Sequence, residues 1–181
     1  MKMCVVDDRM LAGVLDKFVI LPELASKPRA VTTPLNWNVS GFLGKTRIRT
    51  PLGEVAIGSL RVGDSVQSTS KRTLRIRRID RINLDCDFLQ RHPEAQPIHI
   101  MAHAFGRGLP ERDLVVSAGQ ELACAMGGFP LRRTKAGDIE GNASVVQAVH
   151  GALTYHVIEL DQPAYVFAEG VPVLIPVRAH A

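Results

Sequence analysis

The sequence predicts an all-β domain that follows a short N-terminal arm. From residue 41 onward, short runs rich in Val, Ile and Leu are separated by turn residues at fairly regular spacing, as in sheet proteins. Residues 1–40 lack this pattern. Apolar residues make up 46% of the 181 residues, which is enough for one packed core and argues against global disorder.

The predicted arm, residues 1–40, combines a possible short helix with a proline-rich linker. Four apolar residues are spaced like one face of a helix: Met10, Val14, Phe18 and Leu21. Three prolines then interrupt regular structure: Pro22, Pro28 and Pro34. Trp37, the only tryptophan, is expected to anchor the arm onto the domain. Asp7 and Asp8 interrupt any signal peptide, and no apolar run approaches the roughly 20 residues of a membrane span, so we expect a cytoplasmic protein without membrane contact.

The β domain is expected to span residues 41–176, with 177–181 as a tail. Strands are expected at Thr46–Thr50, Glu54–Ile57, Ser65–Thr69, Thr73–Asn83, Ile98–Met101, Asp113–Ser117, Glu121–Ala125, Ser144–Val149, Leu153–Leu160, Tyr165–Ala168 and Val171–Leu174. The alternation slips at Arg77-Arg78, which predicts a β-bulge. Helical turns are expected at Ala102–Phe105 and Leu131–Lys135, and an exposed loop at Lys135–Asn142.

The positive charge is concentrated in one basic run, Lys71–Arg81, in a chain whose net charge is +4. One interpretation is a nucleic-acid patch with contacts from Arg75, Arg77 and Arg78. The other is the solvated face of a strand whose opposite face is apolar. The run has no aromatic residue on which a base could stack, as single-strand binders usually require. We therefore favour the solvated face and expect no nucleic-acid partner.

The cysteines and histidines are not arranged as a metal site. The three cysteines, Cys4, Cys86 and Cys124, are too far apart for a CxxC pair, and we expect reduced thiols. His99 and His103 have the spacing of a zinc pair on a helix, but the apolar residues around His99 predict a strand there. The sequence therefore predicts no metal and no cofactor.

The run GFLGKT at residues 41–46 looks like a phosphate-binding loop, but its spacing excludes one. That motif needs a glycine five positions before the glycine of Gly-Lys-Thr, and Val39 occupies that position. The motif also needs a helix that begins at Lys45-Thr46, whereas Pro51 soon interrupts a strand-like run. This loop is therefore not expected to bind a nucleotide.

The whole run "GFLGKTRIRTPLGEVAIGSLRVGDSV" resembles the opening block of the Hint (Hedgehog/intein) superfamily, especially its bacterial stand-alone branch. The family pattern is roughly Cys-Phe-x-x-Gly-Thr-x-Ile-x-Thr, a glycine turn, a short strand and Leu-x-x-Gly-Asp-x-Val. The matching residues, in order, are Phe42, Thr46, Ile48, Thr50, Gly53, Leu60, Gly63, Asp64 and Val66. "PIHIMAHAFGRGLPERDLVVSAGQELAC" is similar to the second block, and "LTYHVIELDQPAYVFAEGVPV" to the closing block. The resemblance implies a flattened, disc-like horseshoe of long strands.

The resemblance also implies self-cleavage chemistry, which two substitutions oppose. In such domains a first-residue Cys attacks the preceding carbonyl, and a Thr-x-x-His element polarises the amide and supplies a proton. Here Gly41 stands at the nucleophile position, and the second element becomes Ser117-Ala118-Gly119-Gln120. Glycine has no nucleophile, and the Gln120 amide does not titrate. Gly41, Ser117 and Gln120 are thus vestigial site positions.

The sequence therefore predicts a degenerate Hint domain, without enzymatic activity, that acts as a binding or scaffolding module for an unidentified protein partner. The alternative is an active autoprocessing domain that cleaves its backbone near Ser40-Gly41. Ser40 is one residue from the nucleophile position, and a strand would turn it to the opposite face. Thr46 and Glu169 are secondary candidates, with a turn or a buried brace as the structural interpretation of Glu169.

Overall fold

The computed structural model describes residues 37–124, 132–139 and 142–176, and its described elements are almost all strands. The strands are β1 (Phe42–Leu43), β2 (Arg47–Thr50), β3 (Gly53–Ala56), β4 (Ser65–Gln67), β5 (Thr73–Leu84), β6 (Ile98–Ile100), β7 (Leu114–Val116), β8 (Glu121–Cys124), β9 (Arg132–Lys135), β10 (Val145–Gln147), β11 (Leu153–Leu160), β12 (Ala164–Ala168) and β13 (Val171–Ile175). The helices are α1 (Cys86–Arg91) and the 3₁₀ turns η1 (Ile57–Ser59), η2 (Pro93–Ala95) and η3 (Ala136–Asp138). The predicted all-β class is confirmed.

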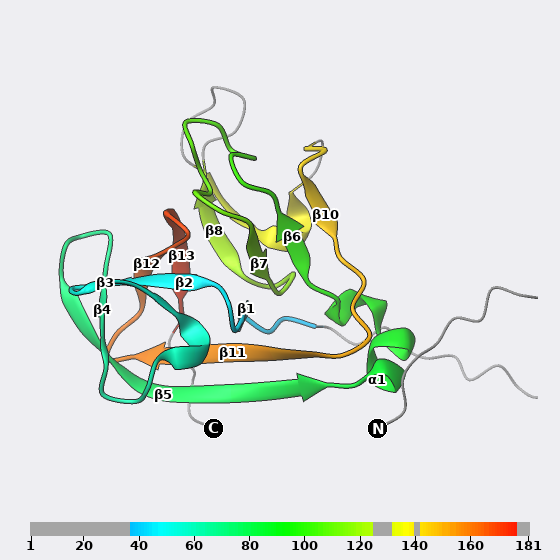
Figure 1. Cartoon of the computed structure of the whole chain (residues 1–181), viewed down its shortest axis with the longest axis horizontal. Coiled ribbons are helices and arrows are strands. Elements are labelled where there is room, and N and C mark those ends of the chain that lie inside the picture. Colours follow the sequence, from blue (N-terminus) through cyan, green and yellow to red (C-terminus); the bar gives the residue numbers. More distant parts are fainter. Residues whose placement is uncertain (1–36, 125–131, 140–141, 177–181) are drawn as a thin grey trace, which may run out of the picture.

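The strands form two antiparallel sheets. The seven-stranded sheet has the order β10-β6-β7-β1-β11-β5-β4, and the six-stranded sheet has the order β3-β2-β12-β13-β8-β9. The long paired strands β5 and β11 run along one side of the molecule, and β6, β7, β8 and β10 rise away from them, so that the strands enclose an angle (Figure 1). The short strand β1 lies between β7 and β11 at this angle.

The start of strand β5 follows directly from the alternation in the sequence. Leu74 and Ile76 are buried, while Arg75 between them and Arg77 after them are exposed. The register places Glu159 opposite Arg78 but Leu160 opposite Ile76, so Arg77 is the extra residue of a bulge. The predicted β-bulge is confirmed at this position.

Two expectations about local structure were wrong. Residues 132–135 form strand β9 rather than a helical turn, because they pair with β8 from Lys135 opposite Glu121 to Arg132 opposite Cys124. The expected loop after β9 begins with η3, and its Ala136 is buried rather than exposed. Helix α1 was not predicted; Asp85 caps it by accepting a hydrogen bond from Phe88 N at 2.8 Å.

The core has two parts. The larger cluster joins both sheets and includes Phe42, Ile48 and Leu122, each at most 1% exposed. The smaller cluster lies around Tyr155, and Trp37 packs against it. The predicted anchor therefore contacts the domain, whereas the rest of the predicted arm, residues 1–36, and the predicted tail lie outside the described residues. Within the described ranges, every helix is too short and polar to cross a membrane.

Candidate functional site

The predicted site positions Gly41 and Ser117 are joined by hydrogen bonds where β1 begins and β7 ends. Gly41 is buried, and its N–H donates to Ser117 Oγ at 3.0 Å. Ser117 N in turn donates to Gly41 O at 2.9 Å. The pairing continues the β1–β7 ladder, in which Phe42 faces Val116. Residues 76 positions apart in the sequence thus share one site.

The Ser117–Gln120 turn holds the chain that precedes Gly41. Ser117 Oγ donates to Val39 O at 2.5 Å, and Ser40 Oγ lies 3.5 Å from Gly119 O. The backbones also meet closely: a Cβ added to Gly119 would lie only 2.8 Å from Val39 O. A glycine at position 119 therefore permits this approach.

Gln120 closes the same turn, but its side chain serves another strand. Its N–H donates to Ser117 O at 3.0 Å, while its side-chain Nε2 donates to Leu174 O at 2.8 Å and to Glu121 O at 3.2 Å. The residue is fully buried, and its Oε1 has no hydrogen-bond partner in the described part of the chain. An amide committed to strand β13 cannot deliver a proton to the Ser40–Gly41 peptide.

The space around Gly41 would admit a small side chain with a slight adjustment. A Cβ at this position would lie 3.2 Å from Tyr155 Cβ and 3.4 Å from Val157 Cγ2. The described cysteines are located elsewhere, Cys86 at the start of α1 and Cys124 at the end of β8. Burial raises the pKa of the Cys124 thiol, which disfavours a reactive thiolate there.

Comparison with known families matches the Hint domain profile to residues 40–173 of this chain. The chain belongs to the Hint domain family. The match begins one residue before Gly41 and includes Ser117 and Gln120, so the resemblance read from the sequence is confirmed at the level of the family.

The fold of this Hint domain is similar to that of solved inteins. A DnaB intein from Synechocystis sp. PCC 6803 is 10% identical with a TM-score of 0.52, and the likeness covers 77% of this chain and all of that one. The corresponding values for the MchDnaB-1 intein are 12%, 0.50, 73% and 98%, and for the bacterial intein-like domain from Clostridium thermocellum 14%, 0.50, 76% and 99%. At such identities the likeness shows the fold alone. A search of curated protein sequences finds no match.

His156 is a residue of this Hint domain that the sequence analysis did not place in the site. It lies on β11 opposite Phe42, is 8% exposed, and its Nδ1 is buried without a hydrogen-bond partner among the described residues. Burial lowers the pKa of its imidazole, which favours the neutral ring. It lines a cavity of about 550 Å³ together with Thr46, whose Oγ1 donates to Val115 O at 3.3 Å. Only the register between β1 and β11 reveals this position.

Glu169 is buried directly after strand β12. It forms the β12–β13 turn with Gly170, at φ angles of 45° and 81°, and Gly tolerates such angles far better than Glu. Its Oε1 accepts from Arg47 N at 2.7 Å, which ties the turn to β2. Burial is the main cause of the raised pKa of this carboxyl.

The arginines of the basic run are exposed along β5 and do not form one free patch. Arg77 is paired with Asp161, and Arg78 Nε lies 2.8 Å from Asp80 Oδ1. The backbone N–H of Arg75 donates to Asp161 Oδ2 at 3.4 Å, a contact that does not involve its guanidinium. In the described ranges, no group of three or more His, Cys, Asp or Glu side chains is arranged to hold a metal ion.

Proposed function

We propose that this Hint domain has lost self-processing chemistry and acts as a binding or scaffolding module. The observation that carries the proposal is the pairing at Gly41. The residue at the nucleophile position has no side chain, and its N–H is occupied by Ser117 Oγ at 3.0 Å. Without a nucleophile the acyl-transfer step cannot begin.

The general-acid position supports the same proposal. Gln120 does not titrate, and its Nε2 already donates to Leu174 O and Glu121 O. General acid–base help is typically worth about 10²–10⁴-fold in rate, so its loss adds to the missing nucleophile. The turn then holds residues 39–41 as uncleaved backbone, through the bonds from Ser117 to Val39 and Gly41.

A second candidate function is self-cleavage one residue earlier, and one contact favours it. Ser117 Oγ donates to Val39 O at 2.5 Å, where it would stabilise negative charge on that oxygen. Ser40 Oγ would attack the Val39 carbonyl carbon, the bond to Ser40 N would break, and that nitrogen would take a proton as the ester forms. Ser40 Oγ currently faces Gly119 O, at 3.5 Å, rather than a base.

The mass of the full chain after incubation with hydroxylamine decides between the two functions, because hydroxylamine cleaves both esters and thioesters. We expect the wild-type chain to remain intact for days. The double variant Gly41→Cys/Gln120→His is the positive control, since both lost groups return and the fragment 1–40 becomes the expected product.

The sites of cleavage separate the possible results. Release of the fragment 1–39 from the wild type, abolished by Ser40→Ala, would establish the second function and contradict the first. Release of 1–40 from the wild type would also contradict the proposed loss of chemistry. An intact wild type beside a cleaved double variant would support the proposal.

A further inference from the structure

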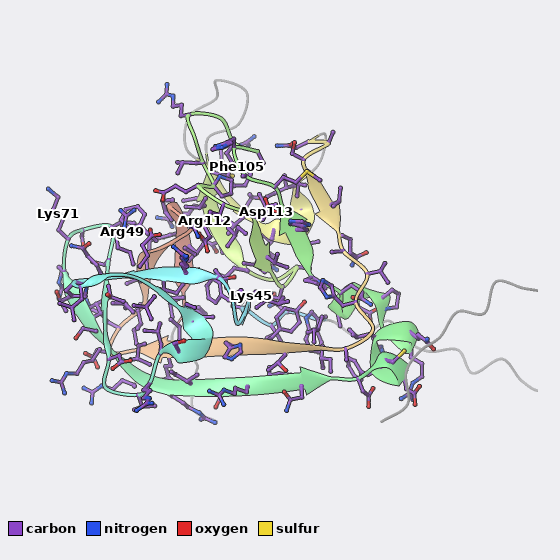
Figure 2. The ribbon with its side chains drawn as sticks, in the orientation of Figure 1. Lys45, Arg49, Lys71, Phe105, Arg112 and Asp113 are labelled. Carbon is purple, nitrogen blue, oxygen red and sulfur yellow. The ribbon has the colours of Figure 1, made fainter. Side chains whose placement is uncertain are left out.

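A groove of about 700 Å³ lies between the β1–β2 turn and the segment that precedes β7. Six charged residues from three parts of the chain line it: Lys45, Arg47, Glu111, Arg112, Asp113 and Glu169. Figure 2 shows Lys45, Arg112 and Asp113 near the inside of the angle that the strands enclose. Three of the six are cations and three are acids, so their individual partners decide what the groove attracts.

Each acid of the groove already has a partner. Asp113 accepts from Ala102 N at 2.9 Å and lies 2.9 Å from His99 Nε2. These two hydrogen bonds hold the pKa of the Asp113 carboxyl below its usual value, and the bond from Ala102 has the larger effect. Glu111 Oε1 lies 3.7 Å from a guanidinium nitrogen of Arg49, a residue that does not line the groove. Glu169 accepts from the Arg47 backbone.

The cations of the groove form no salt bridge within the described ranges, although Arg47 and Arg112 lie near enough to Glu169 to act on it electrostatically. The salt bridges among the described residues do not include the charged groups of Lys45, Arg47 or Arg112. Arg112 and Lys45 are exposed to solvent, and Arg47 is half-buried on β2. Three cations at one hollow, each free of an ion pair within the described ranges, favour an anion there.

Glu169 provides an independent sign of an unfilled site. Glu169 is only 3% exposed, and its Oε2 has no hydrogen-bond partner among the described residues. A buried polar atom without a partner is costly and rare in native structures. Arg47 and Arg112 both act electrostatically on this carboxyl. As a carboxylate oxygen, Oε2 would accept a hydrogen bond from a ligand hydroxyl, such as the P–OH group of hydrogen phosphate.

We propose that this groove binds a small ligand through a phosphoryl group. Guanidinium groups bind phosphate oxygens in pairs and at fixed geometry, and lysine adds a point charge. Arg47 and Arg112 would supply the paired donors, and Lys45 the additional charge. The site uses side chains around a groove and is distinct from the phosphate-loop spacing that the sequence excludes. This binding site is independent of the proposed loss of self-processing. A ligand titration tests the binding site, and the intact-mass measurement tests self-cleavage, so either proposal can fail without the other.

The test is a titration of the full chain with inorganic phosphate, followed by amide chemical shifts and by calorimetry at constant ionic strength. We expect saturable shifts at Lys45, Arg112 and Glu169. Arg112→Gln should weaken binding by about tenfold or more, as expected for loss of a charge-assisted pair. Arg112 is exposed, so the variant should fold. The matched control is Arg61→Gln, which removes an exposed charge outside the groove and should change affinity less than about twofold.

Three results would overturn the proposal. Sodium chloride at the same ionic strength could produce equal shifts, which would indicate screening only. Both arginine variants could weaken binding equally, which would indicate a diffuse charge effect. Acetate could bind more tightly than phosphate, which would assign the groove to carboxylates. A saturable phosphate effect that Arg112→Gln removes and Arg61→Gln preserves supports the proposal.

Discussion

Substitution of Gly119 by alanine tests whether the Ser117–Gln120 turn holds the chain before β1. The added Cβ would lie 2.8 Å from Val39 O, 3.0 Å from Asn38 C and 3.2 Å from Asn38 Cα, whereas ordinary contacts begin at 3.4 Å. All three atoms belong to backbone, so no side chain can rotate away. Overpacking of this kind costs about 1–3 kcal/mol of the free energy of unfolding.

Two measurements follow the effect of Gly119→Ala. Urea unfolding reports the free energy of unfolding, and the emission of Trp37 reports whether residues 37–40 stay docked. Trp37 is the only tryptophan, and its ring lies 5.9 Å from that of Phe88 and 6.2 Å from that of Tyr155. We expect a lower midpoint, a red-shifted native emission, or both.

The matched control is Gly151→Ala, because a Cβ at that glycine would meet no atom within 4 Å. This variant should change the free energy of unfolding by less than about 0.5 kcal/mol and leave the tryptophan emission unchanged. If Gly119→Ala behaves like Gly151→Ala in both measurements, the described approach of Val39 to the turn is wrong.

Three further predictions concern single interactions. Ser117→Ala removes the partner of two backbone groups, Gly41 N and Val39 O, and should lower the free energy of urea unfolding by about 1–3 kcal/mol. Glu169→Gln should gain stability relative to the wild type as pH rises. Burial, with Glu54 nearby, raises the folded-state pKa of Glu169 in spite of Arg47 and Arg112. The stability that the carboxyl contributes is therefore fully present below its unfolded pKa and is lost as pH rises through its folded pKa. Urea midpoints of both proteins across this pH range measure the difference in stability. The triple replacement of Arg75, Arg77 and Arg78 by serine should change the salt at which the chain leaves heparin only slightly; a large drop would favour the nucleic-acid interpretation.

The sequence predicts the long strands well because their side chains alternate over many residues. Strand Leu153–Leu160 has the predicted bounds, and β5 extends one residue beyond its expected end. Elements without such a pattern were missed. Helix α1 depends on one cap at Asp85, and β9 depends on its pairing with β8 rather than on its own residues, Arg132–Lys135. A short element that a distant partner stabilises carries little local signal.

The site divides in the same way. The family resemblance assigns Gly41 and Ser117 to the same site, and hydrogen bonds join them. The burial of His156 and the free oxygen of Glu169 depend on cross-strand register and turn geometry, which no local pattern records. The groove around Lys45 combines residues from the first, second and closing blocks. It could be recognised only once these blocks were placed in space.

Ser117 shows why one catalytic-looking residue is weak evidence for catalysis. Its Oγ accepts from Gly41 N and donates to Val39 O, so one hydroxyl satisfies two backbone groups on the segment that leads into β1. This task needs no nucleophile at position 41 and no titrating group at position 120. Because buried backbone groups must be paired, the hydroxyl would stabilise this junction even in a domain that never cleaves itself. The bond from Ser117 Oγ to Val39 O is both the contact that would polarise the carbonyl and the contact that holds the backbone. It would assist cleavage only if a nucleophile at position 40 or 41 reacted.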